Sequence, residues 1–291
     1  MQQIRSAASM DLILQNWPLI LALISVGGVA GLTAGLFGIG GGAVMVPALF
    51  FAFSQIGVPE KIVMHCAVAT SAAVIILNAL RSTRAHHAKD AVDMSLVWPR
   101  PNWWQSYGLW IGVGAFVAAL WIAPRLSSDA LTRLFAAIAI LVALQFIFGK
   151  PGFVLLQTVP RGPAPAAVGG SIGILSSLMG IGGGSLSVPF LTLFGTPIHR
   201  AIGTAAAFGL FIAVPATLGF ILSGLGIAGR PFGSLGYVNG LGFALITAAA
   251  WPMVPLGAKL AHKMDAVLLR RIFGICLALV ALNMARKTGL F

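Results

Sequence analysis

The stretch that decides the fold is GLFGIGGGAVMVPAL, residues 35–49, which places three consecutive glycines and a proline in a run without charge. Nearly the same phrase, SLMGIGGGSLSVPFL, returns at residues 177–191, so that Gly180 follows Gly38 by 142 positions. Further along, ALTRLFA from Ala130 resembles LLRRIFG from Leu268, 138 positions later. The sequence therefore predicts two repeats of about 140 residues each.

Composition indicates that this chain lives in a lipid bilayer. Of its 291 residues, 58% are hydrophobic and 8% are charged, whereas a soluble domain carries roughly a quarter charged residues. The mean hydropathy is +0.98, and several charge-free runs exceed the ~20 residues that span a bilayer. The formal net charge of +12 does not indicate nucleic acid, because the Lys and Arg residues lie between apolar segments. We predict an all-α polytopic membrane protein whose partner is the bilayer.

The two repeats are expected to be inverted. Each reads as about five apolar segments, in a first transmembrane repeat at residues 17–149 and a second at 165–286, joined by a linker at 150–164. An odd number of segments brings the second repeat into the membrane from the opposite side, around a pseudo-two-fold axis in the membrane plane. One face receives eleven Lys and Arg residues and the other seven, so the first is expected to be cytoplasmic. Both termini of this multi-pass protein would then lie outside, on the face opposite the cytoplasm.

Each glycine phrase is followed by a short apolar segment, residues 43–57 and 185–195. At 1.5 Å per residue the second covers only about half of a ~30 Å hydrocarbon core. We therefore expect glycine-broken helices near the midplane, and both full short spans and re-entrant helices fit the pattern.

Irregular backbone at that depth must be buried in protein or line a cavity. Two facing helix N-termini with free N–H groups suit an anion, and such paired breaks point to a transporter's substrate site. The candidate binding residues are the glycines that follow each break, namely Gly40, Gly41, Gly42, Gly182, Gly183 and Gly184. The alternative is that the glycines only let helices pack closely.

The remaining candidates are polar residues on or after the third segment of each repeat. Thr70 and Ser71 lie eleven and twelve residues past Pro59, and Thr204 lies seven past Pro197, so the threonines could face each other across the axis. His65 is either a proton-linked switch or a structural group. Arg84 and His86 belong to RSTRAHHAKDAVD, residues 81–93, which is either a positive-inside loop or a collector of anions that takes part in gating.

Several classes of function are disfavoured. The six acidic residues lie near segment ends or in loops, which leaves no carboxylate dyad and no oxygen cage for a hard cation. No strand precedes the glycines and no lysine follows them, so neither a dinucleotide site nor a P-loop is indicated. We expect neither a metal nor a cofactor, and we do not expect an enzyme.

The chain resembles the sulfite exporter TauE/SafE family of bacterial inner-membrane permeases over residues 25–284. The resemblance rests on both glycine phrases, on AVATS from Ala67, on RSTRAHHAKDAVD and on the stretch from Gly236 that begins GYVNGLGFALIT. It implies export of a small sulfur oxoanion or organosulfonate, such as sulfite or sulfoacetate, and carries the site hypothesis to the glycines, Thr70 and Thr204. The second repeat departs from symmetry, because Ala205 stands where the first has Ser71.

Together these observations predict a transporter that exports a small anion by alternating access. The alternatives are an anion channel and a non-transporting membrane scaffold or assembly protein. A homodimer is compatible with either.

Overall fold

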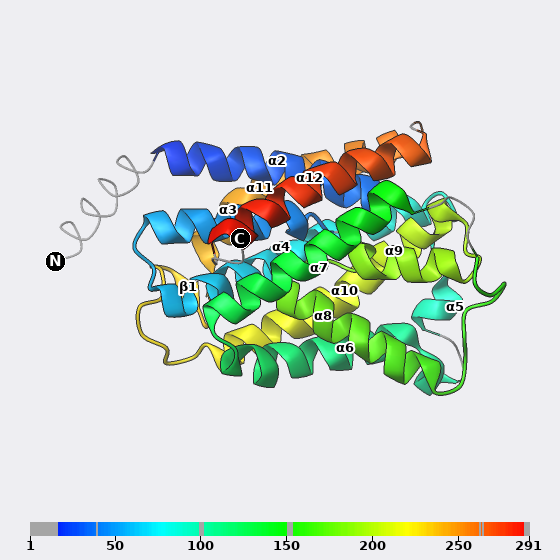
Figure 1. The fold of residues 1–291 in the computed structure, drawn as a ribbon, viewed down its shortest axis with the longest axis horizontal. Helices are drawn as coiled ribbons and strands as arrows, with labels where there is room; N and C mark the ends of the chain where they lie inside the picture. The colour runs from blue at the N-terminus through cyan, green and yellow to red at the C-terminus, as the bar shows by residue number, and fades with distance from the viewer. Residues whose placement is uncertain are drawn as a thin grey trace.

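The computed structural model describes residues 17–38, 40–98, 102–149, 154–261, 263 and 265–287. Most of these residues are helical, and the long helices run side by side along the longest axis of the molecule (Figure 1). The described strands are β1 (Ser234–Leu235) and β2 (Val238–Asn239), which pair antiparallel. The helical prediction is confirmed apart from this pair.

The elements of the first half are α2 (Trp17–Phe37), α3 (Gly42–Gln55), α4 (Glu60–His87), α5 (Met94–Val97), α6 (Tyr107–Val117) and α7 (Ser128–Phe148). The second half holds α8 (Gly170–Met179), α9 (Gly184–Leu193), α10 (Ile198–Ser223), α11 (Gly240–Ala261) and α12 (Ala266–Lys287). Short π and 3-10 turns extend α6 through Ala118–Ile122 and Ala123–Arg125, and a π turn at Pro165–Gly169 precedes α8. In Figure 1, α2 begins and α12 ends at the same end of the bundle.

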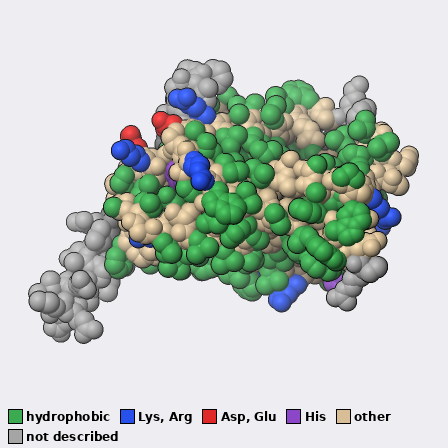
Figure 2. All heavy atoms as spheres, turned by 90° about the horizontal axis from the view of Figure 1, so that it is seen from below, with side chains coloured by type: hydrophobic (Ala, Val, Ile, Leu, Met, Phe, Trp, Pro, Cys, Tyr) green, Lys and Arg blue, Asp and Glu red, His purple; other side chains and the backbone are tan. Residues whose placement is uncertain are grey.

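Six described helical stretches are long and apolar enough to cross a membrane: Ile20–Phe37, Glu60–His87, Tyr107–Arg125, Ser128–Phe148, Ile198–Ser223 and Gly240–Ala261. Four shorter apolar stretches, Gly42–Gln55, Pro165–Met179, Gly184–Leu193 and Gly274–Arg286, account for the other predicted segments. Large apolar side chains such as Leu141, Phe148 and Leu279 are exposed on the outside. Figure 2 shows hydrophobic side chains spread across one face of the molecule, with few charged ones among them. The protein is a multi-pass membrane protein.

The third segment is longer than expected. The helix α4 continues to His87 and so takes in the first half of residues 81–93, which were expected to follow the third segment. Two polar side chains explain the extension: Ser82 Oγ donates to the Ala34 carbonyl at 3.2 Å, and His86 Nε2 lies 3.1 Å from the Gly35 carbonyl oxygen. These carbonyls belong to the last turn of α2, where the Ala34 carbonyl also accepts from the Gly38 amide at 3.0 Å.

Glycines spaced four apart bring α2 onto α11. A Cβ atom at Gly31 would lie 2.3 Å from the Ala250 carbonyl oxygen, and one at Gly35 would lie 2.1 Å from that of Val254. Gly27 makes the same kind of contact one turn earlier, with Ile246. Small residues at this spacing let helix backbones approach closely in membranes.

The same arrangement joins α8 to α6. A Cβ atom at Gly173 would lie 2.0 Å from the Ile111 carbonyl oxygen, and Ser177 Oγ donates to the Ala115 carbonyl at 3.1 Å. Gly173 and Ser177 follow Gly31 and Gly35 by 142 positions, the offset of the glycine phrases. Helices at matching positions of the two halves thus carry matching contacts.

Candidate functional site

Two interruptions of helical structure, at the glycine phrases, meet inside the bundle. The first break separates α2 from α3 and the second separates α8 from α9. A Cβ atom at Gly42 would lie 2.2 Å from the Gly180 carbonyl oxygen and 2.8 Å from the Ile181 Cα atom. The breaks, 142 residues apart in sequence, therefore touch through their backbones. All six predicted glycines are buried, and Ile39 lies outside the described residues.

Each break also rests on the long helix of the other half. A Cβ atom at Gly38 would lie 2.5 Å from the Ile202 carbonyl oxygen of α10, and one at Gly180 would lie 3.0 Å from the Val68 backbone of α4. Ile202 and Val68 each precede the predicted threonine of their helix by two residues. The two halves hold each other's breaks in corresponding ways.

The backbone conformation at the breaks requires glycine. Gly41 has a φ of +82°, and its Cβ atom would lie 2.4 Å from the Ala30 carbonyl oxygen. Gly180, which ends α8, has a φ of +61°. Residues other than glycine rarely adopt these φ angles. Gly183 has an ordinary φ, but a Cβ atom there would lie 2.5 Å from the Ala205 carbonyl oxygen.

Polar side chains of α4 satisfy carbonyl groups at both breaks. Ser71 Oγ donates to the Gly180 carbonyl at 2.8 Å, and Asn78 Nδ2 donates to the Gly40 carbonyl at 3.2 Å. Ser71 was predicted to bind substrate, and here its hydroxyl hydrogen is engaged by the other half's break. The Val44 amide of α3 already donates to the Gly41 carbonyl at 3.1 Å, and the Ser187 amide of α9 to the Gly183 carbonyl at 2.9 Å. The N–H groups that the breaks can offer a ligand are therefore those of the residues before these two, at the very start of each helix. Helix N-termini of this kind attract anions.

Thr70 and Thr204 occupy corresponding positions. Thr70 Oγ1 accepts a hydrogen bond at 2.9 Å from the backbone N–H of Asn239, just before α11. Thr204 Oγ1 accepts one at 2.9 Å from the backbone N–H of Asp93, just before α5. Each hydroxyl thus anchors a segment of the opposite half. Both side chains are fully buried.

The threonines do not face each other, contrary to the sequence-based expectation. The antiparallel helices α4 and α10 meet where Gly209 packs on Ala79, since a Cβ atom at Gly209 would lie 3.2 Å from the Ala79 Cβ atom. Thr70 lies nine residues from Ala79 and Thr204 five from Gly209, in opposite directions along the bundle. At 1.5 Å per residue they are about 21 Å apart along the helices.

We predict that Thr70→Val and Thr204→Val each lower the free energy of unfolding by about 1–3 kcal/mol, because each leaves an anchored amide without its acceptor. Thermal unfolding in detergent measures the loss. Thr192→Val is the matched control, since the Thr192 hydroxyl bonds only to carbonyls of its own helix. Equal melting temperatures for all three variants would contradict the anchoring role.

His65 lies at the end of the bundle where α4 begins. Its Nε2 donates to the Ala123 carbonyl at 3.0 Å, and its ring stacks on Tyr237 with centroids 5.2 Å apart. Burial, and to a smaller extent Cys66, raise the pKa of the Tyr237 phenol, while Arg230 opposes them. The phenol therefore stays neutral near pH 7. These contacts support a structural role for His65 at this end.

Arg84 and His86 lie near the opposite end of α4. His86 is buried against the last turn of α2, immediately before the first break, whereas Arg84 is exposed. Because α4 rises about 1.5 Å per residue, His65 and His86 are separated by roughly 30 Å. The structure does not bring the three predicted gating residues together.

Sequence reasoning missed the role of Asn78 and Ser82, which hold the first break and the end of α2. The spacing of the polar residues in this segment could have indicated that role. Ser71, Asn78, Ser82 and His86 are spaced by seven, four and four residues, which places them on one face of a helix. A polar stripe along an apolar segment indicates a face that packs against backbone or a site rather than against lipid.

Comparison with known proteins agrees with a transporter. The family described as Sulfite exporter TauE/SafE matches residues 23–284. A probable membrane transporter protein of Haemophilus influenzae is 34% identical over 273 residues, which cover 92% of this chain and 98% of the relative. The probable membrane transporter protein YunE of Bacillus subtilis is 26% identical, covering 92% and 98%.

A relative from Methanocaldococcus jannaschii, also described as a probable membrane transporter protein, is 26% identical and covers 91% of this chain. No solved structure matches the chain significantly. The match to the family extends over nearly all of both halves, including both glycine phrases. This protein belongs to the sulfite exporter TauE/SafE family, whose members are membrane transporters and not enzymes.

Proposed function

We propose that the protein exports a small anion, a sulfur oxoanion or organosulfonate such as sulfite or sulfoacetate, across the inner membrane. The single observation that carries this proposal is the contact between the two breaks, in which Gly42 meets Gly180. It brings the beginning of α3 close to the turn that leads into α9. The first-turn amides and the dipoles of both helices then favour an anion between them.

We propose further that the halves are inverted repeats which move against each other in alternating access. The matching contacts of α2 with α11 and of α8 with α6 support this arrangement, as do the reciprocal contacts of Thr70 and Thr204. The short helices α3 and α9 would be re-entrant, because the chain turns back after α2 and brings Gly41, the residue before α3, beside Ala30 of α2. With the face that carries eleven Lys and Arg residues in the cytoplasm, both termini are periplasmic. The arrangement is compatible with a homodimer.

The membrane potential supplies the direction. An inside-negative potential favours anion exit by ~2.3 kcal/mol per charge per 100 mV. Transport therefore needs no acidic proton relay, in keeping with the positions of the acidic residues near segment ends. A uniporter satisfies these conditions.

The test is anion binding and flux with the purified full chain. Sulfite, sulfoacetate, sulfate, taurine and acetate are added to protein in detergent, and thermal unfolding is recorded. A ligand at 100 times its Kd should add about 2.7 kcal/mol to the free energy of unfolding. Flux of the stabilising anion is then measured in proteoliposomes with a set potential.

We expect stabilisation by a sulfur anion and saturable flux. Flux that rises linearly with concentration, without saturation, would favour the channel instead. A folded protein that shows neither stabilisation nor flux would favour the scaffold, in which the glycines serve packing alone.

A further inference from the structure

The second break is surrounded by serines, and the first is not. The positions 142 residues earlier carry no hydroxyl: Ala34, Gly35, Ala43 and Met45 stand where the second half has Ser176, Ser177, Ser185 and Ser187. Each break packs on the long helix of the other half in the same way. The two breaks therefore differ in the hydroxyl groups around them rather than in how they are held.

Two of the four serines have partners that explain them. Ser177 donates to the Ala115 carbonyl at 3.1 Å, and Ser185 lies 3.5 Å from the Gly182 carbonyl. The hydroxyls of Ser176 and Ser187 have no hydrogen-bond partner among the described residues, although both side chains are fully buried. A buried hydroxyl without a partner destabilises the folded protein.

Both residues are tied to the break itself. The Ser176 carbonyl accepts a hydrogen bond from the Ile181 amide at 3.1 Å, and the Ser187 amide donates to the Gly183 carbonyl at 2.9 Å. Ser176 lies in the last turn of α8 and Ser187 in the first turns of α9. The two residues with unpartnered hydroxyls therefore lie on either side of the second break in the chain.

Helical hydroxyls without a partner in the described part of the chain also include those of Thr83, Thr217 and Thr247. Other helical serines bond to their own helix. Ser54 and Ser171 each donate at 2.8 Å to the carbonyl four residues before them, on Phe50 and Ala167. The Ser176 and Ser187 hydroxyls do not make this bond. Their hydrogens remain available to something other than their own helices.

The first break offers the opposite polarity. Asn78 uses its Nδ2 group on the Gly40 carbonyl, and its Oδ1 atom, an acceptor, is left without a partner in the described part of the chain. An acceptor does not stabilise an anion. Ser71 and Asn78 of the first half spend their donors on carbonyls of the breaks, so the unpartnered hydroxyls next to the breaks come from the second half.

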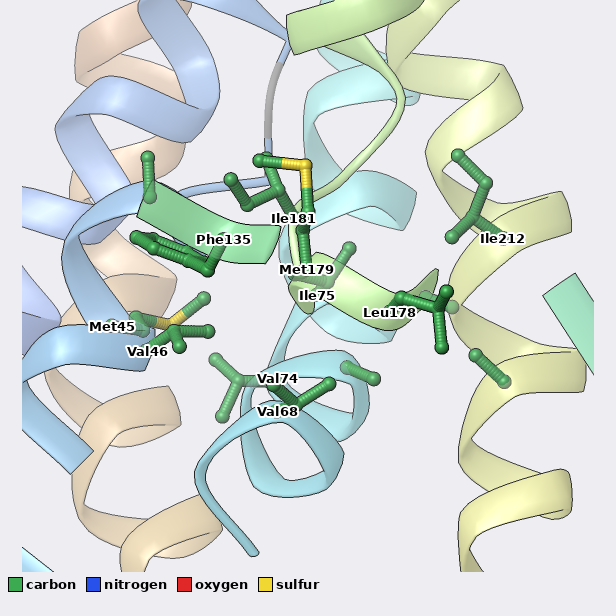
Figure 3. Close-up of a cluster of buried hydrophobic side chains, with 14 of the residues drawn as sticks. Met45, Val46, Val68, Val74, Ile75, Phe135, Leu178, Met179, Ile181 and Ile212 are labelled. Carbon is green, nitrogen blue, oxygen red and sulfur yellow. The ribbon is translucent and has the colours of Figure 1, made fainter. Parts of the chain in front are cut away.

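The surroundings would strengthen a bond to charge. Leu178, Met179 and Ile181 extend from the second break into a cluster with apolar side chains of α3, α4 and α10 (Figure 3). Hydrogen bonds to an ionised acceptor are stronger than neutral ones, and a low local dielectric increases their strength.

We propose that the Ser176 and Ser187 hydroxyls donate hydrogen bonds to oxygens of the transported oxoanion, so that the second half supplies the side-chain recognition of the substrate. This inference rests on the proposed function, because it assigns residues to the same anion site. The site is then asymmetric, with backbone amides from both breaks and hydroxyls from one.

The test compares Ser176→Ala and Ser187→Ala with two control variants in the full-length protein. Ser171→Ala removes an exposed hydroxyl on α8, and Ser177→Ala removes a hydroxyl that bonds to α6. The Kd for sulfite and for sulfoacetate is obtained from the concentration dependence of the melting temperature, and flux is measured in proteoliposomes. The melting temperature without anion reports on structure alone.

We expect Ser176→Ala and Ser187→Ala each to raise the Kd about tenfold to a hundredfold, the range for hydrogen bonds to charged groups, without lowering the anion-free melting temperature. Ser177→Ala should lower that temperature and keep the Kd, and Ser171→Ala should change neither.

Wild-type Kd values in both test variants would overturn the inference while leaving the proposed function intact. A lower anion-free melting temperature with an unchanged Kd would also overturn it, since the hydroxyls would then be structural. A folded wild-type protein that responds to neither anion would overturn the proposed function, and the serine assignment with it.

Discussion

Replacing Gly42 with alanine is expected to disrupt the contact between the two breaks and to remove much of the protein's stability. The new methyl group would lie 2.2 Å from the Gly180 carbonyl oxygen and 2.8 Å from the Ile181 Cα atom, and both are backbone atoms. A backbone that is itself packed against α4 cannot rotate away as a flexible side chain can. We expect a loss of about 3 kcal/mol or more, at the upper end of the range for overpacked sites.

Thermal unfolding in detergent, with size-exclusion chromatography to detect aggregation, measures this effect. Gly170→Ala is the matched control, because no atom lies within 4 Å of a Cβ placed there. That variant should retain or slightly raise the melting temperature, since alanine is the better helix former. A folded Gly42→Ala protein with the wild-type melting temperature would contradict the contact between the breaks.

Gly31→Ala is expected to separate α2 from α11. The Cβ atom would lie 2.3 Å from the Ala250 carbonyl oxygen and 2.7 Å from its Cα atom, so the helices must move apart along the whole glycine stripe. Close backbone approach supplies much of the packing energy between helices in a bilayer. The expected loss in the free energy of unfolding is about 2–3 kcal/mol, with a matching fall in the melting temperature.

Gly28→Ala is the control for this helix, because its Cβ atom would meet nothing within 4 Å. It should stabilise the helix by about 0.5–1 kcal/mol. If Gly31→Ala behaved like Gly28→Ala, the close approach of α2 to α11 would be refuted. Cysteine cross-linking across the two helices provides an independent measure of their separation.

Both glycine predictions bear on how the anion site can be tested. At Gly41, Gly42 and Gly183 a methyl group would meet backbone atoms, so alanine variants change packing whether or not an anion binds there. A loss of transport in these variants follows from either role. The hydroxyls of Ser176 and Ser187 can be removed without a steric clash, and for that reason they discriminate where the glycines do not.

Much of the fold could be predicted from the sequence. Charge-free runs reveal membrane helices because the bilayer core excludes charge, and a glycine triplet before a short apolar segment reveals a helix end. Both signals are local in the chain. The membrane class and the positions of the two breaks, at Gly38 and Gly180, could therefore be predicted without knowing which segments pack together.

The partners of the site residues could not be predicted in the same way. From the sequence, Thr70 and Thr204 could face each other, but the distance between them depends on how α4 aligns with α10, which meet at Ala79 and Gly209. Ser71, which was predicted to bind substrate, holds the Gly180 carbonyl. The end of α4 was also placed too early, because His86 finds its acceptor on a helix fifty residues away in sequence.

The pairing of α2 with α11 has a consequence for biosynthesis. Gly27, Gly31 and Gly35 of α2 can contact α11 only when residues about 220 positions later have been translated. At 5–20 residues per second this takes roughly ten to forty seconds, during which the stripe faces lipid or the insertion machinery. Nascent chains truncated before α11 should therefore be recognised by quality-control proteases, although every earlier helix is already in the bilayer.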